Sequence, residues 1–166
     1  MAFLEKKLKV KKSTLPNAGK GLFTTIDVLK GTRIVEYKGT RTTWSEVEDD
    51  DGKNGYIFYI NSKNVIDALP HKNALGRYAN DARGITRVEG IRNNAQYIIE
   101  KGRCYIDAMK DIKAGEEILV SYSADYWRVI KGNLGIKSKK KKTKTNKTKS
   151  SKKKNKSSAK KKSKKK

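Results

Sequence analysis

Four short segments hold the residues of this chain that could carry chemistry: glycines, which let a ligand approach the backbone closely, and tyrosine, arginine and asparagine side chains. In chain order the segments are residues 18–23 (AGKGLF), 36–39 (EYKG), 75–82 (LGRYANDA) and 108–122 (AMKDIKAGEEILVSY). Each segment alone is a weak signal, because a Gly-x-Gly is usually a turn and an Ile-Lys-Ala-Gly-Glu-Glu run could close any hairpin. A lone Cys104 and a lone His71 cannot supply a four-ligand zinc site, so the sequence predicts no metal centre.

Taken together and in this order, the four segments resemble the SET-domain protein lysine methyltransferases, and the resemblance covers about residues 7–127. The corresponding patterns of that family are Gly-x-Gly-Leu/Phe, Tyr-x-Gly, Arg-Phe-x-Asn-His-Ser and Arg-Asp-Ile-x-x-Gly-Glu-Glu-Leu-x-x-x-Tyr. The resemblance implies transfer of a methyl group from S-adenosylmethionine to the side-chain amine of a protein lysine.

This transfer requires an acceptor amine that is close, in line and uncharged. A free lysine has a pKa of about 10.4, so only about one in a thousand is neutral near pH 7. A water-poor, largely apolar channel beside the positive sulfonium disfavours the ammonium form, through desolvation and like-charge repulsion. SET enzymes build such a channel from tyrosines and main-chain carbonyls.

By its place in the fourth segment, Tyr122 matches the catalytic tyrosine of the family, and Tyr37 matches a second tyrosine at the reaction site. Tyr56 matches a further channel tyrosine. The alternative for each is a half-buried strand residue whose hydroxyl reaches solvent. Val120 stands where side-chain bulk limits the methylation state, so its small size predicts di- or trimethylation. Tyr126 and Trp127 are expected to close the lysine channel, and the alternative for Trp127 is an ordinary core anchor.

The resemblance also implies a cofactor site for S-adenosylmethionine. Main-chain groups of the first segment would contact the methionine part of the cofactor, and Asn80 would donate or accept a hydrogen bond. The alternative for Asn80 is a turn residue that tolerates left-handed geometry. The predicted cofactor-binding residues are Lys20, Gly21, Leu22, Arg77, Asn80 and Tyr122.

The chain departs from the family pattern at two adjacent positions. Asp81 stands where most members have His, and Ala82 where many have Ser or Cys. Whatever that His supports must be done differently here or be lost. The divergent PR-type branch of the family also lacks the Asn-His pair, and residues 73–83 are similar to it. Residues 123–166 contain no Cys-rich zinc-binding segment of the kind that often follows the domain.

The elements expected around these segments are short strands separated by turns. One short helix is expected over residues 43–48, with Thr42 or Thr43 as its N-cap, before an exposed loop at 49–55. No run of twelve or more residues keeps a 3.6-residue period, which argues against a Rossmann-like methyltransferase. The predicted fold is α+β and predominantly β: a SET fold of several small sheets around a threaded C-terminal segment. The expected strands are 8–11, 22–23, 34–37, 56–60, 64–67, 95–99, 103–107 and 117–120.

Charge and apolar residues divide the chain into two parts. The 166 residues carry a net charge of +24, and residues 137–166 contain 18 lysines and no acidic residue, which leaves +6 for residues 1–136. Every aromatic residue, Met and Cys lies before residue 137. We therefore predict a SET-like methyltransferase domain over residues 1–136 and a disordered Lys-rich tail over 137–166, because the tail has nothing apolar to bury.

The tail predicts sequence-independent binding to nucleic acid through phosphate neutralisation, and it resembles the basic tails of linker histones. Residues 139–142 also fit a nuclear import signal. Two alternatives stay open: a solubilising tail, and a tail that is itself a substrate of the enzyme. The predicted nucleic-acid-binding residues are Lys139, Lys140, Lys141, Lys142, Lys152, Lys153 and Lys154.

The leading hypothesis is a lysine methyltransferase that acts on histones, although another lysine-containing protein, such as a ribosomal protein, fits the same chemistry. The competing hypothesis is a SET-like scaffold that lost activity through Asp81 and binds DNA or chromatin through its tail. No apolar run resembles a signal peptide or reaches transmembrane length, so we expect a soluble intracellular monomer or homodimer without a membrane partner. In a eukaryotic or viral setting this predicts the nucleus and chromatin.

Overall fold

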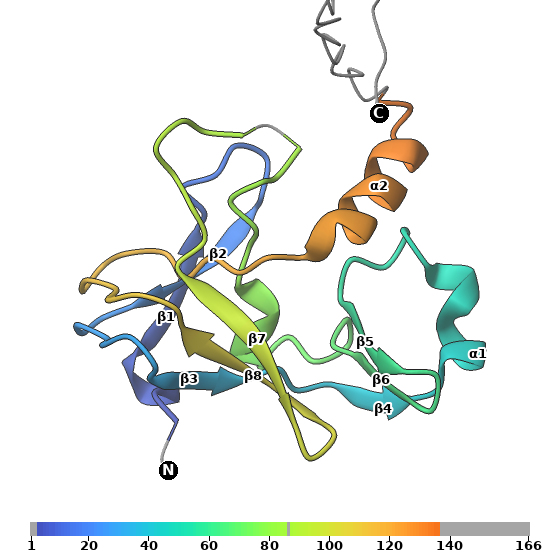
Figure 1. Cartoon of the computed structure of the whole chain (residues 1–166), viewed down its shortest axis with the longest axis horizontal. Coiled ribbons are helices and arrows are strands. Elements are labelled where there is room, and N and C mark those ends of the chain that lie inside the picture. The colour runs from blue at the N-terminus through green and yellow to red at the C-terminus, as the bar shows by residue number, and fades with distance from the viewer. Residues whose placement is uncertain (1–2, 86, 137–166) are drawn as a thin grey trace, which may run out of the picture.

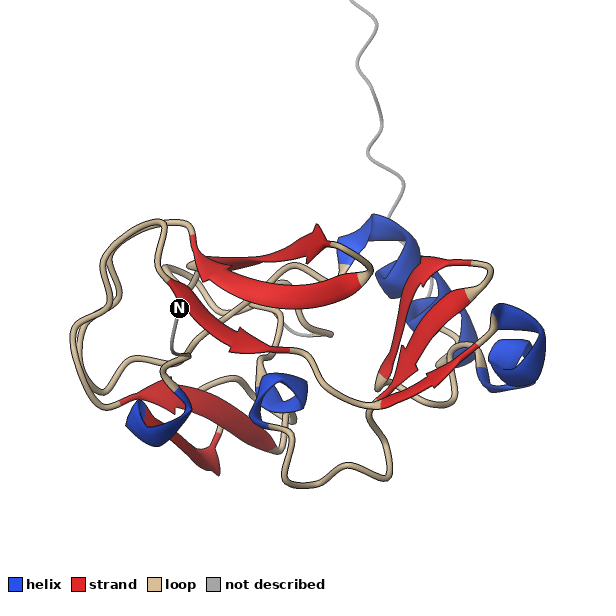
Figure 2. Ribbon diagram, turned by 90° about the horizontal axis from the view of Figure 1, so that it is seen from below, coloured by secondary structure: helices blue, strands red, loops and turns tan. Residues whose placement is uncertain are grey.

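The structure is a computed structural model that describes residues 3–85 and 87–136 of the chain. Within these ranges three small antiparallel sheets form the body, as Figure 2 shows. The first sheet pairs β1 (Leu8–Lys12) with β2 (Lys20–Thr24). The second has the strand order β3 (Arg33–Glu36), β8 (Arg103–Ala108) and β7 (Ala95–Glu100). The third has the order β4 (Thr40–Thr42), β6 (Asn64–Asp67) and β5 (Ile57–Asn61).

Short helices connect and flank the sheets. They are the 3-10 helices η1 (Glu5–Lys7), η2 (Glu48–Asp50) and η3 (Leu75–Tyr78), and the α-helices α1 (Trp44–Val47) and α2 (Ser123–Asn133). The predicted fold class, α+β with β predominant and several small sheets, is confirmed. None of the helices in the described ranges is long and apolar enough to cross a membrane.

Local sequence explains the turn between β7 and β8 and the first α-helix. Lys101 and Gly102 have φ values of 48° and 72°, the left-handed geometry that a two-residue hairpin turn requires, and Glu100 pairs with Arg103 on either side of them. The α1 helix begins directly after Thr43, whose main-chain N–H donates to the Glu46 carboxylate at 3.0 Å. Thr43 is therefore the N-cap, as expected.

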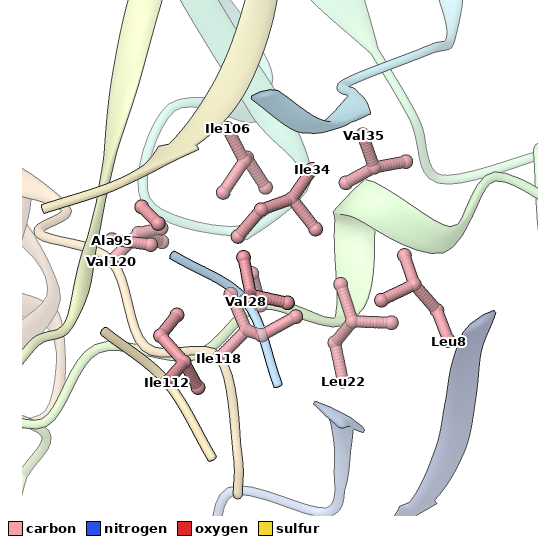
Figure 3. Packing of buried hydrophobic residues seen from close by; sticks show 12 residues of the cluster. Leu8, Leu22, Val28, Ile34, Val35, Ala95, Ile106, Ile112, Ile118 and Val120 are labelled. Carbon is pink, nitrogen blue, oxygen red and sulfur yellow. The ribbon is translucent and has the colours of Figure 1, made fainter. Parts of the chain in front are cut away.

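The main hydrophobic core lies between the first two sheets and the segments that join them (Figure 3). Burial of each large aliphatic side chain stabilises the fold by about 1.5–3 kcal/mol. Strands that alternate between two faces supply part of this core, and single residues of the connecting loops supply the rest. Its largest fully buried members include Leu22, Ile34, Ile106, Ile112 and Ile118.

The prediction of a strand over residues 117–120 is wrong. These residues make only isolated bridges, from Glu117 to Phe23 and from Leu119 to Asn80. All four are buried, because the segment runs between other parts of the chain instead of along one edge of a sheet. The N–H of Ile118 donates to Leu22 O at 2.7 Å on one side, and that of Val120 donates to Asn80 O at 2.8 Å on the other. The C-terminal segment is thus threaded, as predicted.

Sequence reasoning did not predict helix α2. It spans only 11 residues and has no fully buried side chain, so its apolar period is weak. Figure 1 shows α2 beside the loop that joins α1 to β5, and the side-chain amide of Asn133 donates to Gly52 O at 3.2 Å. The helix therefore packs against this loop, next to the cavity described below.

Candidate active site

A cavity of about 680 Å³ lies between the third sheet, the end of β7 and helix α2. Five aromatic residues from separate parts of the chain form much of its wall. They are Tyr37 after β3, Phe58 in β5, Tyr97 in β7, Tyr122 before α2, and Tyr126 in α2. The structure therefore brings together two tyrosines that the sequence predicted for the reaction site, Tyr37 and Tyr122, in one aromatic pocket.

Tyr122 is held at both ends. Its hydroxyl donates to Ala79 O at 2.7 Å, and its main-chain N–H donates to the Asp81 carboxylate at 2.9 Å. Burial is the main cause that raises the pKa of Tyr122 well above its ordinary value. The hydroxyl therefore stays protonated near neutral pH and keeps a fixed direction in the cavity wall.

Tyr37 is 5% exposed, and its hydroxyl donates to Tyr56 O at 2.9 Å. Burial raises the pKa of Tyr37 far above its ordinary value, so this hydroxyl also stays protonated. Tyr56, the third predicted channel tyrosine, thus meets Tyr37 through its main-chain carbonyl. The Tyr56 ring itself lies under the guanidinium of Arg77, 3.9 Å from ring centre to Cζ.

Two cavity residues, Phe58 and Tyr97, were missed by sequence reasoning. Their ring centres are 4.7 Å apart, and the Tyr37 ring lies 5.5 Å from Phe58 and 5.9 Å from Tyr97. Burial raises the pKa of Tyr97 well above its ordinary value. Alternation along β5 and along β7 indicates on which face of its own strand each residue lies. It does not indicate that this face borders a cavity, because the two strands belong to different sheets.

Arg77, a predicted cofactor residue, lies in η3 and lines the same cavity. It is 8% exposed, yet its Nε has no hydrogen-bond partner among the described residues. Its guanidinium is instead stacked on aromatic rings, Tyr56 at 3.9 Å and Tyr78 at 5.3 Å. Buried N–H groups are normally paired, so this donor suits a ligand that brings its own acceptor.

The other predicted cofactor residues meet around the buried carboxylate of Glu117. The Asn80 side-chain amide donates to Lys20 O at 3.0 Å and to Glu117 at 3.1 Å. A Cβ at Gly21 would overlap the Glu117 carboxylate, so the glycine is required by a neighbour within the protein. Lys20, Gly21 and Asn80 are therefore close together, and their contact with a cofactor stays a prediction.

A search against protein families matches the SET domain to residues 19–123, more than half of the chain. This chain belongs to the SET domain family. The assignment agrees with the predicted resemblance and with the small sheets around a threaded segment.

Known relatives of this SET domain include a histone-lysine N-methyltransferase. Histone-lysine N-methyltransferase EZH2 of Chaetomium thermophilum is 32% identical over 128 residues, covering 69% of this chain and only 8% of the relative. Among solved structures, the methyltransferase domain of human PR domain-containing protein 2 is 27% identical with a TM-score of 0.54 (71% of this chain, 78% of that chain). A humanized mutant of the Chaetomium thermophilum Polycomb Repressive Complex 2, bound to the inhibitor GSK126, is 28% identical with a TM-score of 0.55 (70% and 15%).

The structure places two predicted site residues of this SET domain in the main core. Leu22 and Val120 are both fully buried in the same hydrophobic cluster as Ile106, and neither lines the cavity. The roles predicted for Leu22 in cofactor binding and for Val120 in the methylation state therefore stay predictions. Leu22 lies in β2 and Val120 in the threaded segment, and both side chains pack into this cluster.

Trp127 lies in α2 behind Tyr122, with their rings stacked at 6.0 Å and 15°. Its indole N–H donates to Asp81 at 2.8 Å, and its neighbour Tyr126 lines the cavity. In this SET domain Tyr126 therefore borders the cavity, while Trp127 packs against Tyr122. Within residues 3–85 and 87–136 no three His, Cys, Asp or Glu side chains are placed to hold a metal.

Proposed function

We propose that this chain is an S-adenosylmethionine-dependent protein lysine N-methyltransferase. The observation that carries the proposal is the aromatic cavity in which the hydroxyls of Tyr122 and Tyr37 are each fixed to a main-chain carbonyl. Such a pocket suits the apolar methylene chain of a lysine whose terminal amine must lose its proton. Membership of the SET domain family and the names of the relatives support the same activity.

The residues present fit the methyl donor. S-adenosylmethionine supplies an electrophilic methyl on a positively charged sulfonium, and its methionine part carries a carboxylate. Arg77 offers the unpaired donor described above, and that donor suits a carboxylate. Lys20 O and the Asn80 amide lie together at the first segment, where main-chain and amide groups would hold the rest of the methionine part.

The protein's own residues would prepare the acceptor amine. The aromatic walls exclude water and so disfavour the charged ammonium form. Because the pKa values of Tyr37 and Tyr122 are both raised, neither side chain is a phenolate base near neutral pH. Their role is to orient: each hydroxyl oxygen is held in place by the hydrogen bond that its proton donates. The amine proton leaves to solvent as the lysine enters the channel.

We propose further that the substrate lysine lies in a basic, histone-like segment. Asp51 and Asp125 line the cavity, and the acidic residues 48–50 immediately precede Asp51. Asp125 also pairs with Arg128, so Asp51 is the more available of the two. Acidic groups at the cavity attract a positively charged peptide and steer its approach. One relative is a histone-lysine N-methyltransferase, which supports this class of substrate.

The predicted tail lies outside the described residues. It includes the seven lysines at 139–142 and 152–154 that are predicted to bind nucleic acid. We propose that the tail attaches the enzyme to nucleic acid without sequence preference, with nuclear chromatin as the place of action in a eukaryotic or viral setting. Its basis is the run of lysines alone. Retention on DNA should then fall steeply as salt is raised, and fall further when these lysines are replaced by glutamine.

Transfer of labelled methyl from S-adenosylmethionine to histones tests the activity. The Tyr122→Phe variant should lower the rate at least about 100-fold with little change in thermal stability, because the oriented hydroxyl at the reaction site is lost. Tyr105→Phe is the matched control, since Tyr105 lies in β8 outside the cavity, and it should keep the wild-type rate. Label on the enzyme itself would identify the tail as a substrate.

No transfer by the wild-type chain, together with no cofactor binding in calorimetry, would contradict the proposal. That result would leave the inactive scaffold that binds nucleic acid through its tail.

A further inference from the structure

Asp81 is a buried carboxylate at the meeting point of four segments. It is 2% exposed and lies just after η3, two residues beyond Ala79. It replaces the histidine that most members of the family carry at this place. Its two oxygens accept hydrogen bonds from the described parts of the chain only through neutral donors, and no cation pairs with it there.

Each oxygen has two donors. Oδ1 accepts from the Arg83 N–H at 2.8 Å and the Asn93 side-chain amide at 3.0 Å. Oδ2 accepts from the Tyr122 N–H at 2.9 Å and the Trp127 indole at 2.8 Å. One side chain thus joins the loop after η3, the segment before β7, the catalytic tyrosine and helix α2.

Only a carboxylate can fill this position with four donors around it. An ionised carboxylate has about four acceptor sites and no donor, whereas a neutral imidazole has one acceptor and one donor. A histidine here would leave buried N–H groups without partners, which is costly. The acceptor sites of the aspartate therefore match the four donors around it, and its presence does not indicate a site that has lost activity.

Segment 79–81 accepts hydrogen bonds from both the hydroxyl and the main-chain N–H of Tyr122. Ala79 O accepts the Tyr122 hydroxyl at 2.7 Å, Asp81 accepts its main-chain N–H at 2.9 Å, and Asn80 O accepts the Val120 N–H at 2.8 Å. Asp81 adds a second restraint through Trp127, whose ring is stacked on Tyr122. The position of the Tyr122 hydroxyl thus depends on one carboxylate through two routes.

We propose that Asp81 is a positioning residue for methyl transfer, holding Tyr122 through its main-chain N–H and through the indole of Trp127. The inference rests on the proposed methyltransferase function. It adds that the exchange of histidine for aspartate preserves activity by a different set of hydrogen bonds.

The test compares the full chain with its Asp81→Asn and Asp81→His variants. Methyl transfer to histone peptides is measured as kcat and KM, and the indole N–H signals are followed by NMR. Trp44 is an internal reference, because Trp127 and Trp44 are the two tryptophans of the chain and Trp44 lies in α1. Asp107→Asn is the control, because Asp107 is half-buried and hydrogen-bonded to Arg33 but lies outside the cavity.

In the Asp81→Asn variant kcat should fall at least tenfold with KM changed less than threefold, since the tyrosine is displaced while the peptide surface is kept. The Trp127 indole signal should move, and the Trp44 signal should stay. Asp81→His should be at least as impaired. Trp127→Phe keeps a ring on Tyr122 but removes the indole donor, so it should lower kcat by a smaller factor even if the Asp81 variants fold poorly.

An unchanged kcat in both Asp81→Asn and Trp127→Phe would overturn the inference while leaving the proposed function intact. A loss of kcat matched by Asp107→Asn would also overturn it, because the effect would then be general destabilisation. If the wild-type chain transfers no methyl, the proposed function fails, and this inference fails with it.

Discussion

Arg77 places a positive charge in the wall of the aromatic cavity, and its Nε–H donor has no partner among residues 3–85 and 87–136. Its stacking on Tyr56 holds the guanidinium in place, and a lysine ammonium could not reproduce the planar group or its Nε donor. At this scale the cavity wall is held by pairs of groups: the Tyr122 hydroxyl with Ala79 O, and the Tyr37 hydroxyl with Tyr56 O.

We expect Arg77→Lys to weaken binding of S-adenosylmethionine by about tenfold or more, because a charge-assisted hydrogen bond is worth about 1.5–3 kcal/mol. Isothermal titration calorimetry measures the change in Kd. Arg41→Lys is the control, since Arg41 is exposed on β4 and does not line the cavity, and it should bind as the wild type does. Equal affinity of the two variants would show that Arg77 does not contact the cofactor.

At the scale of elements, the cavity depends on how closely α2 approaches the loop after η2. Gly52 has φ of 71°, and a Cβ there would overlap Asn133 and Val129 of α2. Val129 also lines the cavity. The helix is therefore placed by a glycine about seventy residues earlier in the chain, together with the Asp81–Trp127 hydrogen bond.

Gly52→Ala should push α2 away from the loop and raise KM for a histone peptide several-fold. Gly31→Ala is a matched control, because Gly31 has a similar φ of 83° but nothing within 4 Å of the added Cβ. Both variants bear the left-handed strain of about 1–2 kcal/mol, so both should lose thermal stability to a similar degree. Steady-state kinetics would contradict the role of α2 if KM rose equally in both variants.

For the whole molecule, the gathering of tyrosines in one buried region determines how stability depends on pH. Burial raises the pKa values of Tyr37, Tyr97 and Tyr122 above the ordinary value near 10. The folded protein thus holds these phenol protons more tightly than the unfolded chain. The resulting stability is fully present below about pH 10 and is lost as the pH rises above that value toward the folded-state pKa values.

We therefore expect the melting temperature to fall steeply above about pH 10, when phenolates form in the unfolded chain. Thermal melts from pH 8 to 12 measure this, with phenolate absorbance recorded in parallel. The slope should be shallower in Tyr37→Phe than in the wild type, because one proton fewer is released on unfolding. A slope that is identical in the two proteins would refute the assignment. Methyl transfer should meanwhile keep rising up to about pH 10, as more acceptor lysine becomes neutral.

The sequence by itself determined the family, the fold class, most of the strands, and two tyrosines that the structure places in the cavity wall. These features depend on local patterns: turn residues such as Lys101-Gly102, alternation along strands, and the four short segments. A motif fixes the spacing of its residues, so Tyr122 was found from the Gly-Glu-Glu run seven residues before it.

Only the tertiary structure decided which faces of those elements border the cavity. Phe58 and Tyr97 lie on strands of different sheets, and their meeting depends on packing between segments about forty residues apart. Leu22 and Val120 belong to matched motifs, yet both side chains are packed in the core. In the sequence Asp81 stands out only because it replaces the family's histidine. The structure shows that it accepts four hydrogen bonds, from donors at positions 83, 93, 122 and 127. The hydrogen bonds from positions 93, 122 and 127 span 12 to 46 residues, so they are set by the packed fold and no local pattern encodes them.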